Sequence, residues 1–200
     1  MAPIKNKYII PMAMNMVFLL LLHFGMVNAQ EKPKTMDWET AKKARLEGTK
    51  KLAFLIGEWK SETWFYKEGK RPEQPEVGSY KAEWSLNGAF ISDDISATHQ
   101  GNVYLGKSYH SFNPYTQLFE TWYFDSDGLV VLYPNGKWED SNTLVFSGKD
   151  VNPSGIVAKK TYFKINSPDS FDLIEKQDYG DGKGFVAVLE VKYKRISNEK

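Results

Sequence analysis

The sequence of 200 residues contains no cysteine and only three histidines. Without cysteine the chain can form no disulfide and no thiolate metal site, and no lipid can be attached at a cleavage-site cysteine. Its stability must therefore come from packing. Long apolar runs are also lacking, since the stretch from Met16 to Leu22 is shorter than the roughly 20 residues that span a bilayer. We expect no stable membrane span.

The start of the chain has the features of a targeting segment. Lys5 and Lys7 precede the apolar stretch, and Val27-Asn28-Ala29 offers the small residues at which a signal peptidase cuts. The pattern predicts a secretory signal peptide over residues 1–29 and a flexible tail over residues 30–34, with an uncleaved membrane anchor as the alternative. We expect the mature protein to be exported, and so to be periplasmic or secreted.

The charge balance and the absent motifs narrow the classes of function. The chain carries 26 basic and 25 acidic side chains and has no basic run with interleaved aromatic residues, which argues against a nucleic-acid partner. It contains no G-x-S-x-G elbow, phosphate loop or HExxH motif, which argues against a familiar hydrolase and leaves other catalysis open. We expect no metal and no cofactor.

The sequence is rich in the pattern of β-strands. Aromatic residues make up 14% of the chain, which is typical of sheets with cross-strand aromatic pairs. Polar and apolar residues alternate most clearly over residues 79–86, where every second side chain from Tyr80 to Leu86 is apolar. About ten such segments lie between Gly57 and Arg195, separated by turns that contain glycine, asparagine or proline.

The connections between these segments predict an up-and-down antiparallel β-barrel of the all-β class. They contain no helical crossover, so neighbouring strands must be antiparallel. A meander of about ten strands exposes two edges unless it closes or splits into two layers, and we favour closure. Residues 37–51 consist mainly of helix-forming residues and predict a short helix before the first strand. We expect one domain over residues 35–200.

Gly57 and Trp59 indicate how one end of the barrel is sealed. A large flat side chain at the start of the first strand can plug a barrel if the preceding chain bends sharply, which glycine permits. Arg195 lies near the end of the last predicted strand, on its mostly apolar face. Because an inward arginine should stack on an aromatic ring and donate to backbone carbonyls, we expect Arg195 to pair with Trp59.

Three motifs, LAFLIGEW, WSLNGAFI and GKSYHSFNPYTQLFETWYFDSDG, resemble in order and spacing an uncharacterised family of bacterial lipocalin-like domains. The match covers roughly residues 50–150. Gly-x-Trp on the first strand with arginine on the last is the hallmark of such lipocalin-like, or calycin, barrels. The resemblance implies this fold and assigns no catalytic residue. Nitrobindin-type barrels hold haem through a histidine near the chain end, but residues 156–200 contain no histidine, so we do not expect haem.

Polar residues on apolar strand faces are the candidates for chemistry. His110 is a candidate general base or ligand contact, with an ordinary hydrogen-bonded strand residue as the alternative. Glu175 and Gln177 share a face with Phe171 and Leu173. Inside the barrel Glu175 would need a cation, a polar ligand group or a raised pKa, whereas at the mouth it would be solvated.

Other polar residues are weaker candidates. Glu120 lies on a strand with two apolar faces, and in Asp93-Asp94 one of the two carboxylates must point outward. His99 and His110 are too far apart along their hairpin to share a metal. Three aromatic residues are candidates to line a cavity for an apolar or aromatic ligand, with ordinary core packing as the alternative: Tyr80, Trp84 and Trp122.

Three hypotheses for function follow. The first is an exported, non-catalytic barrel that binds a small, partly apolar molecule in its lumen. The contacts would be Tyr80, Trp84, His110, Trp122, Glu175 and Gln177. The second is an enzyme that acts on a small molecule in the same cavity, with His110 or Glu175 as acid or base. The third is a packed barrel that serves as a protein-interaction module through Trp64 and Tyr66.

These hypotheses differ in what the lumen should contain. A lumen too small for several non-hydrogen atoms would remove the first two. A carboxylate within hydrogen-bond reach of His110 and shielded from water would favour the enzyme, whereas a wholly apolar lining would favour binding.

Overall fold

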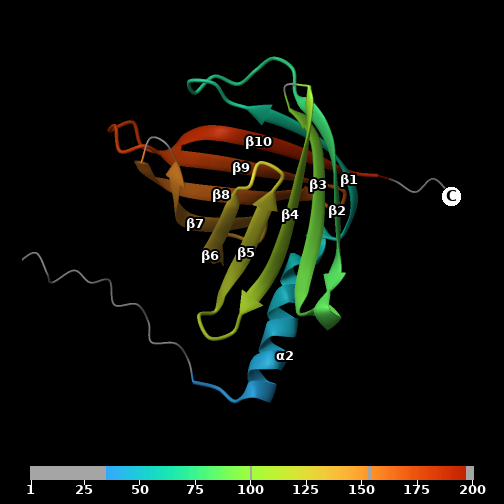
Figure 1. The fold of residues 1–200 in the computed structure, drawn as a ribbon. Coiled ribbons are helices and arrows are strands. Elements are labelled where there is room, and N and C mark those ends of the chain that lie inside the picture. Colours follow the sequence, from blue (N-terminus) through green and yellow to red (C-terminus); the bar gives the residue numbers. More distant parts are fainter. Residues whose placement is uncertain (1–34, 100, 153–154, 197–200) are drawn as a thin grey trace, which may run out of the picture. The chain divides into compact units, whose positions relative to one another are not determined.

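The computed structural model describes residues 35–99, 101–152 and 155–196, so the predicted signal peptide and tail lie outside the described residues. Within these ranges the chain forms ten antiparallel strands and one short N-terminal α-helix (Figure 1). The strands are β1 (Gly57–Phe65), β2 (Glu76–Ser85), β3 (Phe90–His99), β4 (Asn102–Asn113), β5 (Leu118–Asp125), β6 (Val130–Trp138), β7 (Thr143–Asn152), β8 (Gly155–Ser167), β9 (Ser170–Asp178) and β10 (Val186–Arg195). The predicted fold class is confirmed.

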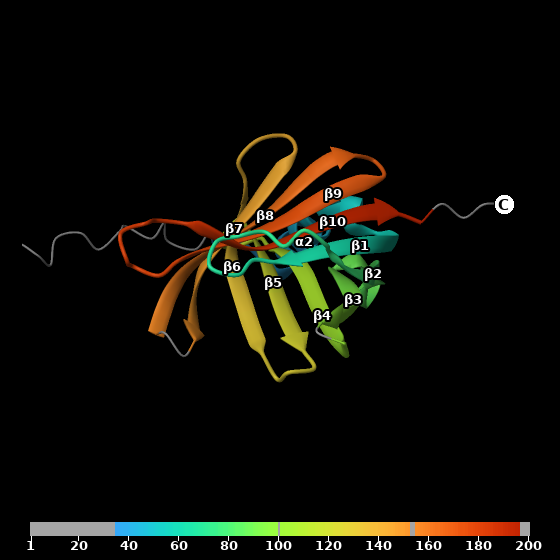
Figure 2. The ribbon, with the colours of Figure 1, turned by 90° about the horizontal axis from the view of Figure 1, so that it is seen from above.

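The strands form one closed barrel in the order of an up-and-down meander. Each strand pairs with the next one along the chain, and β1 completes the ring by pairing with β10, beside which it lies in Figure 2. Closure gives every described strand two neighbours, although β6 and β7 pair over only three residues of each, Gly136–Trp138 and Leu144–Phe146. The register places Trp59 opposite both Tyr80 and Arg195.

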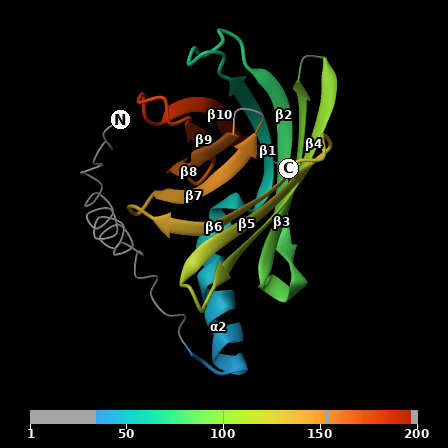
Figure 3. The same cartoon turned by 60° about the vertical axis from the view of Figure 1, so that its left-hand side comes forward.

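The helix α2 (Trp38–Thr49) lies at one end of the barrel (Figure 3). Asp37 caps it by accepting a hydrogen bond of 2.9 Å from the Thr40 backbone N–H, which satisfies one of the free donors at a helix start. Near its end Gly48 lies so close to Phe112 of β4 that a side chain there would overlap the ring. The predicted helix is confirmed, and its last turns contact β4.

A buried apolar cluster fills the end of the barrel next to the helix. The 3-10 helix η1 (Lys50–Leu55) follows α2 and places Leu52 and Leu55 in this cluster. Trp59 at the start of β1 is only 1% exposed, and its ring meets that of Phe171 edge-on with centroids 4.9 Å apart. Its Nε1–H donates to the Leu55 carbonyl over 2.9 Å. The indole therefore closes the floor of the barrel.

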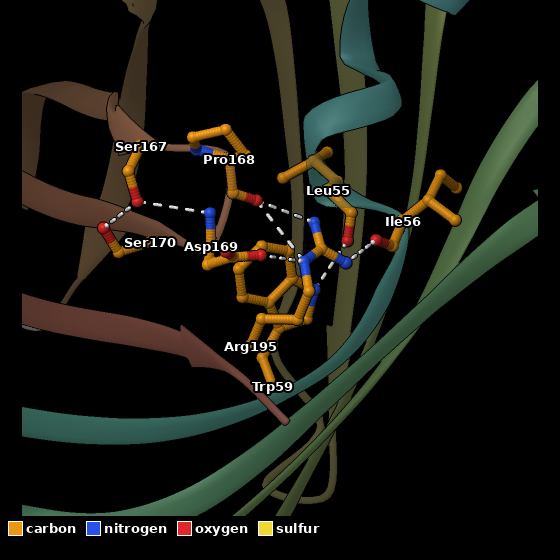
Figure 4. A network of polar contacts seen from close by, with 8 residues as sticks. All are labelled: Leu55, Ile56, Trp59, Ser167, Pro168, Asp169, Ser170 and Arg195. Carbon is orange, nitrogen blue, oxygen red and sulfur yellow. Dashed lines mark hydrogen bonds and ion pairs between the residues drawn. The ribbon is translucent and has the colours of Figure 1, made fainter. Parts of the chain in front are cut away.

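Arg195 stacks on this indole from the end of β10 (Figure 4). Its Cζ lies 3.9 Å from the Trp59 ring centroid, and its Nη1 donates to the Ile56 carbonyl over 2.7 Å. Gly57 has a φ of 125°, a conformation that L side chains rarely adopt, and a Cβ there would collide with Nη1 of Arg195. The expected pairing of Arg195 with Trp59 is present, and Gly57 makes room for it.

We predict that Trp59→Ala lowers the free energy of unfolding by about 3 to 5 kcal/mol, because it removes a buried ring and leaves a cavity in the floor. Urea denaturation measures this loss. The matched control is Trp38→Ala, since Trp38 is 72% exposed on α2 and its removal should cost less than about 0.5 kcal/mol. A loss below about 1 kcal/mol for Trp59→Ala would contradict its role as the plug.

Candidate functional site

The barrel encloses a cavity of about 250 Å³ above the plugged floor. Every one of the ten described strands contributes at least one lining side chain. The lining also includes Leu129, which is 42% exposed, so the cavity reaches the surface at the end opposite the floor. Since an apolar cavity of about 150 Å³ holds benzene, this cavity has room for roughly ten non-hydrogen atoms.

A buried chain of hydrogen bonds runs along one wall of the cavity. His110 on β4 lies 2.6 Å from Oδ2 of Asp93 through its Nε2 and 2.8 Å from Oγ1 of Thr121 through its Nδ1. The backbone N–H of Ser108 donates to the other oxygen of Asp93 over 3.0 Å. Asp93 and His110 are only 2% and 4% exposed. When a neutral imidazole donates its Nε2–H to the Asp93 carboxylate, its Nδ1 is left to accept from the Thr121 hydroxyl.

An internal ion pair occupies another part of the lining. Nζ of Lys159 on β8 lies 2.9 Å from Oε2 of Glu175 on β9. Tyr133 from β6 donates its hydroxyl to the same oxygen over 3.4 Å, and Gln177 donates to Oε1 over 3.1 Å. The lumen carboxylate expected at Glu175 thus has the cation that burial requires.

The surroundings of this pair alter two pKa values. Burial alone would lower the pKa of Lys159, but the negative charge of Glu175 and the nearby Tyr133 outweigh it and raise that pKa. Burial, with the charge of Glu175, raises the pKa of Tyr133 to about 12. At neutral pH Lys159 is therefore charged and the Tyr133 hydroxyl keeps its proton.

Two hydroxyls of the lining are buried beside polar neighbours: that of Tyr80 on β2 lies beside Asp93, and that of Thr161 on β8 lies beside Tyr133. Burial, together with the nearby charge of Asp93, raises the pKa of Tyr80 well above its ordinary value, so its hydroxyl stays protonated. Both hydroxyls have almost no accessible surface, so they belong to the buried wall of the cavity.

Several sequence predictions for the cavity agree with this geometry. Tyr80, His110 and Glu175 line it. Gln177 is not part of the lining, but it donates to Glu175 over 3.1 Å. A role of these four residues in ligand binding stays a prediction.

The structure places Trp84 and Trp122 outside the cavity, which corrects the prediction for both. Trp84 shares the parity of Tyr80, but it lies where β2 runs past the floor, and it is 43% exposed. On β5 the inward positions are Thr121 and Tyr123, so Trp122 faces outward and packs against Phe90 with ring centroids 6.0 Å apart. Both faces of β5 are apolar, and alternation alone therefore gave the wrong face.

The positions of Trp64 and Tyr66 do not support the hypothesis of a protein-interaction module. Trp64 is only 7% exposed, because the guanidinium of Arg71 lies 3.8 Å above its ring. Tyr66 donates its hydroxyl to Glu190 over 3.1 Å. Neither side chain is presented as a free apolar contact for a partner.

Sequence reasoning missed much of the polar lining. In Asp93-Asp94 it is Asp93 that points inward, while Asp94 pairs with Lys107 on the outside at 2.7 Å. Lys159 and Thr161 share a face with Val157 and Phe163 on β8, and a lysine on an apolar face was a signal that pointed to a buried ion pair. Thr121 carried no such signal, because a threonine is ordinary in a strand.

The fold and the cavity together define the class of this protein: it is a closed β-barrel with an internal, partly polar cavity. No helix in the described ranges is both long and apolar enough to cross a membrane. Among the same residues, no group of three or more histidine, aspartate or glutamate side chains is arranged to hold a metal ion.

Residues 46–195 match the family DUF1579, which is described as a protein of unknown function. The chain therefore belongs to this family. A search of curated proteins found no match. The predicted kinship to an uncharacterised barrel family is thus shown at the level of DUF1579 and of the barrel fold.

Three solved structures are similar to this chain at low identity. A redesigned β-barrel matches at 13% identity and a TM-score of 0.38, with 72% of this chain and 94% of that chain covered. A de novo designed fluorescence-activating β-barrel matches at 12% and 0.40, with 72% and 95% covered. The structure of EF1p2_mFAP2b bound to DFHBI matches at 11% and 0.38, with 74% and 98% covered.

We predict that Lys159→Met lowers the free energy of unfolding by about 3 kcal/mol, because it leaves the Glu175 carboxylate buried without its cation. The double variant Lys159→Met/Glu175→Met should be more stable than Lys159→Met alone, since it removes both charges. Lys107→Met is the control: its pair with Asp94 is exposed and should contribute less than about 1 kcal/mol. Equal losses for the two lysine variants in urea denaturation would show that the internal pair is not shielded.

Proposed function

We propose that the protein is an exported barrel, periplasmic or secreted and related to the lipocalin-like barrels, that binds a small, partly apolar molecule in its lumen without transforming it. The observation that carries the proposal is the cavity of about 250 Å³, whose lining is mostly apolar and aromatic and holds a few polar side chains, among them His110, Lys159 and Glu175. Ligand pockets combine apolar walls with a few placed polar groups, and this lining has that character.

The polar networks of the lining support binding because each is complete without a substrate. Both ring nitrogens of His110 already contact protein groups, namely Asp93 and Thr121. Lys159 and Glu175 neutralise each other. Such networks hold the walls in one arrangement, so that a ligand meets a preformed cavity.

Native mass spectrometry of the purified protein tests the proposal. We expect a co-purifying molecule of roughly ten non-hydrogen atoms, and we expect Ala97→Trp to reduce its occupancy at least about tenfold, since Ala97 lines the cavity on β3. Thr98→Trp places the same ring on the outer face of the same strand and should leave occupancy unchanged. If Ala97→Trp retains as much ligand as Thr98→Trp, the molecule is not bound in the lumen.

Catalysis in the same cavity is the second candidate, and the chain Asp93–His110–Thr121 favours it. The Asp93 carboxylate lies 2.6 Å from His110 and is shielded from water, which is the arrangement expected of an enzyme that uses His110 as a base. His110 would act through the Thr121 hydroxyl: that oxygen attacks an ester carbonyl, His110 takes its proton and then returns it to the leaving alcohol, and water releases the acyl group.

For this candidate we predict that the protein hydrolyses p-nitrophenyl acetate above the rate in buffer and that Thr121→Val lowers the excess rate at least about a hundredfold. Release of p-nitrophenol measures the rate. Thr98→Val, on the exposed face of β3, is the matched control and should retain the full rate. Equal rates for Thr121→Val and the unaltered protein would remove Thr121 from any catalytic role and leave binding as the function.

A further inference from the structure

We propose that the protein forms a homodimer in which one edge of β6 pairs with the same edge of a second copy as an antiparallel strand. The pairing segment is residues 130–133, in the half of β6 that lies toward the mouth of the barrel. The dimer does not depend on whether the lumen binds a ligand, because it uses backbone groups and outer side chains of the barrel wall.

The ladder between β6 and β7 is the shortest in the described ring. It holds three residue pairs, whereas each of the others holds at least five. Beyond Gly136 the two strands diverge (Figure 2), and the side chain of Asn135 donates to the Ser147 carbonyl over 3.3 Å where they part. Among the described strands, residues 130–133 therefore pair only with β5.

The backbone groups on this free edge belong to Val130 and Leu132. In an antiparallel ladder, alternate residues bond to the same neighbouring strand. The Asp125 N–H donates to the Leu129 carbonyl over 3.1 Å, so Leu129 bonds toward β5. By this alternation Val131 also bonds toward β5, and the N–H and C=O groups of Val130 and Leu132 point away from it.

The sequence of this edge favours pairing with another strand. Residues 129–133 read LVVLY, and they include no charge, glycine or proline. Exposed edge strands are usually protected from association by charged side chains or proline. The facing edge of β7 has such protection, because residues 147–152 read SGKDVN. The edge of β6 has none, and uncharged segments rich in β-forming residues are those that pair between chains.

The outer surface beside the free edge is also apolar. Val130 and Leu132 are 68% and 49% exposed, and the register aligns Val130 with Phe124 of β5, which is 40% exposed. Lys107 of β4 lies in the same row, but Asp94 neutralises it at 2.7 Å. An apolar surface of this kind that borders a free edge indicates an interface with a partner that is itself apolar.

The edge is complementary to itself, which is why we assign a second copy as the partner. Antiparallel pairing about a two-fold axis at Val131 places Val130 of each copy opposite Leu132 of the other. Both residues have free N–H and C=O groups, so each pair exchanges both hydrogen bonds, and their side chains share the outer face. An axis at Leu132 would instead place Val130 opposite Pro134, which has no N–H to donate.

Sedimentation equilibrium of the purified protein over a concentration series tests the proposal. We expect a reversible equilibrium between monomer and dimer, and we expect Val130→Lys to raise the dissociation constant at least about tenfold, because lysine at a sheet edge opposes pairing. Val77→Lys is the matched control, since Val77 on β2 is also 68% exposed and pairs with Glu62 of β1. A protein that is monomeric at every concentration, or equal dissociation constants for the two variants, would overturn the proposal.

Leu132→Pro tests the backbone pairing without adding a charge. Because the Leu132 N–H points away from β5, proline removes a donor of the free edge and leaves the bonds to β5 intact. We expect it to weaken the dimer at least about tenfold as well. Circular dichroism shows whether the variant folds, and if it does not, Val130→Lys decides the question by itself.

Amide hydrogen exchange locates the interface. The amides of Val130 and Leu132 should be protected at high protein concentration and should lose this protection on dilution. A dimer in which both amides exchange freely would place the interface elsewhere. Protection that persists in the monomer would show that another segment of the same chain covers the edge. Either of these results would contradict the proposed dimer.

Discussion

The contact on which the rest of this structure depends is the stacking of Arg195 on Trp59. It joins the last strand to the first at the floor, and the guanidinium also donates to the carbonyl of Ile56, in the turn that leads into β1. The same indole is tied to η1 through the Leu55 carbonyl. One buried ring thus fixes where the chain enters the barrel, where it leaves, and which end is sealed. The apolar cluster around this ring fills only the floor of the barrel, and the cavity lies above it.

Above the floor the lining is neither an apolar core nor a solvated channel. It holds two carboxylates, a lysine and an imidazole at positions where burial would be costly for each alone, and each has its partner within the lumen. The Asp93–His110–Thr121 chain and the Lys159–Glu175 pair therefore maintain the shape of the walls.

Predictions from the sequence succeeded where a local constraint was strong. A glycine two residues before a tryptophan and an arginine near the last strand's end led to the plug and its partner. His110, Glu175 and Tyr80 were candidates for the lumen, and all three line the cavity, while their role in binding stays a prediction. Trp122 was placed wrongly because both faces of β5 are apolar, and Trp84 because alternation does not reveal where a strand passes the end of a barrel.

The sequence by itself determined the class of fold, the meander order, the helix before β1 and the residues of the plug, since strand period, turn composition and glycine conformation are local properties of the chain. The tertiary structure alone decided which polar residues meet inside. Thr121 and Asp93 become partners of His110, and Lys159 becomes the partner of Glu175, only because neighbouring strands align in a particular register. Register is set by closure of the whole ring, and no short stretch of sequence contains it.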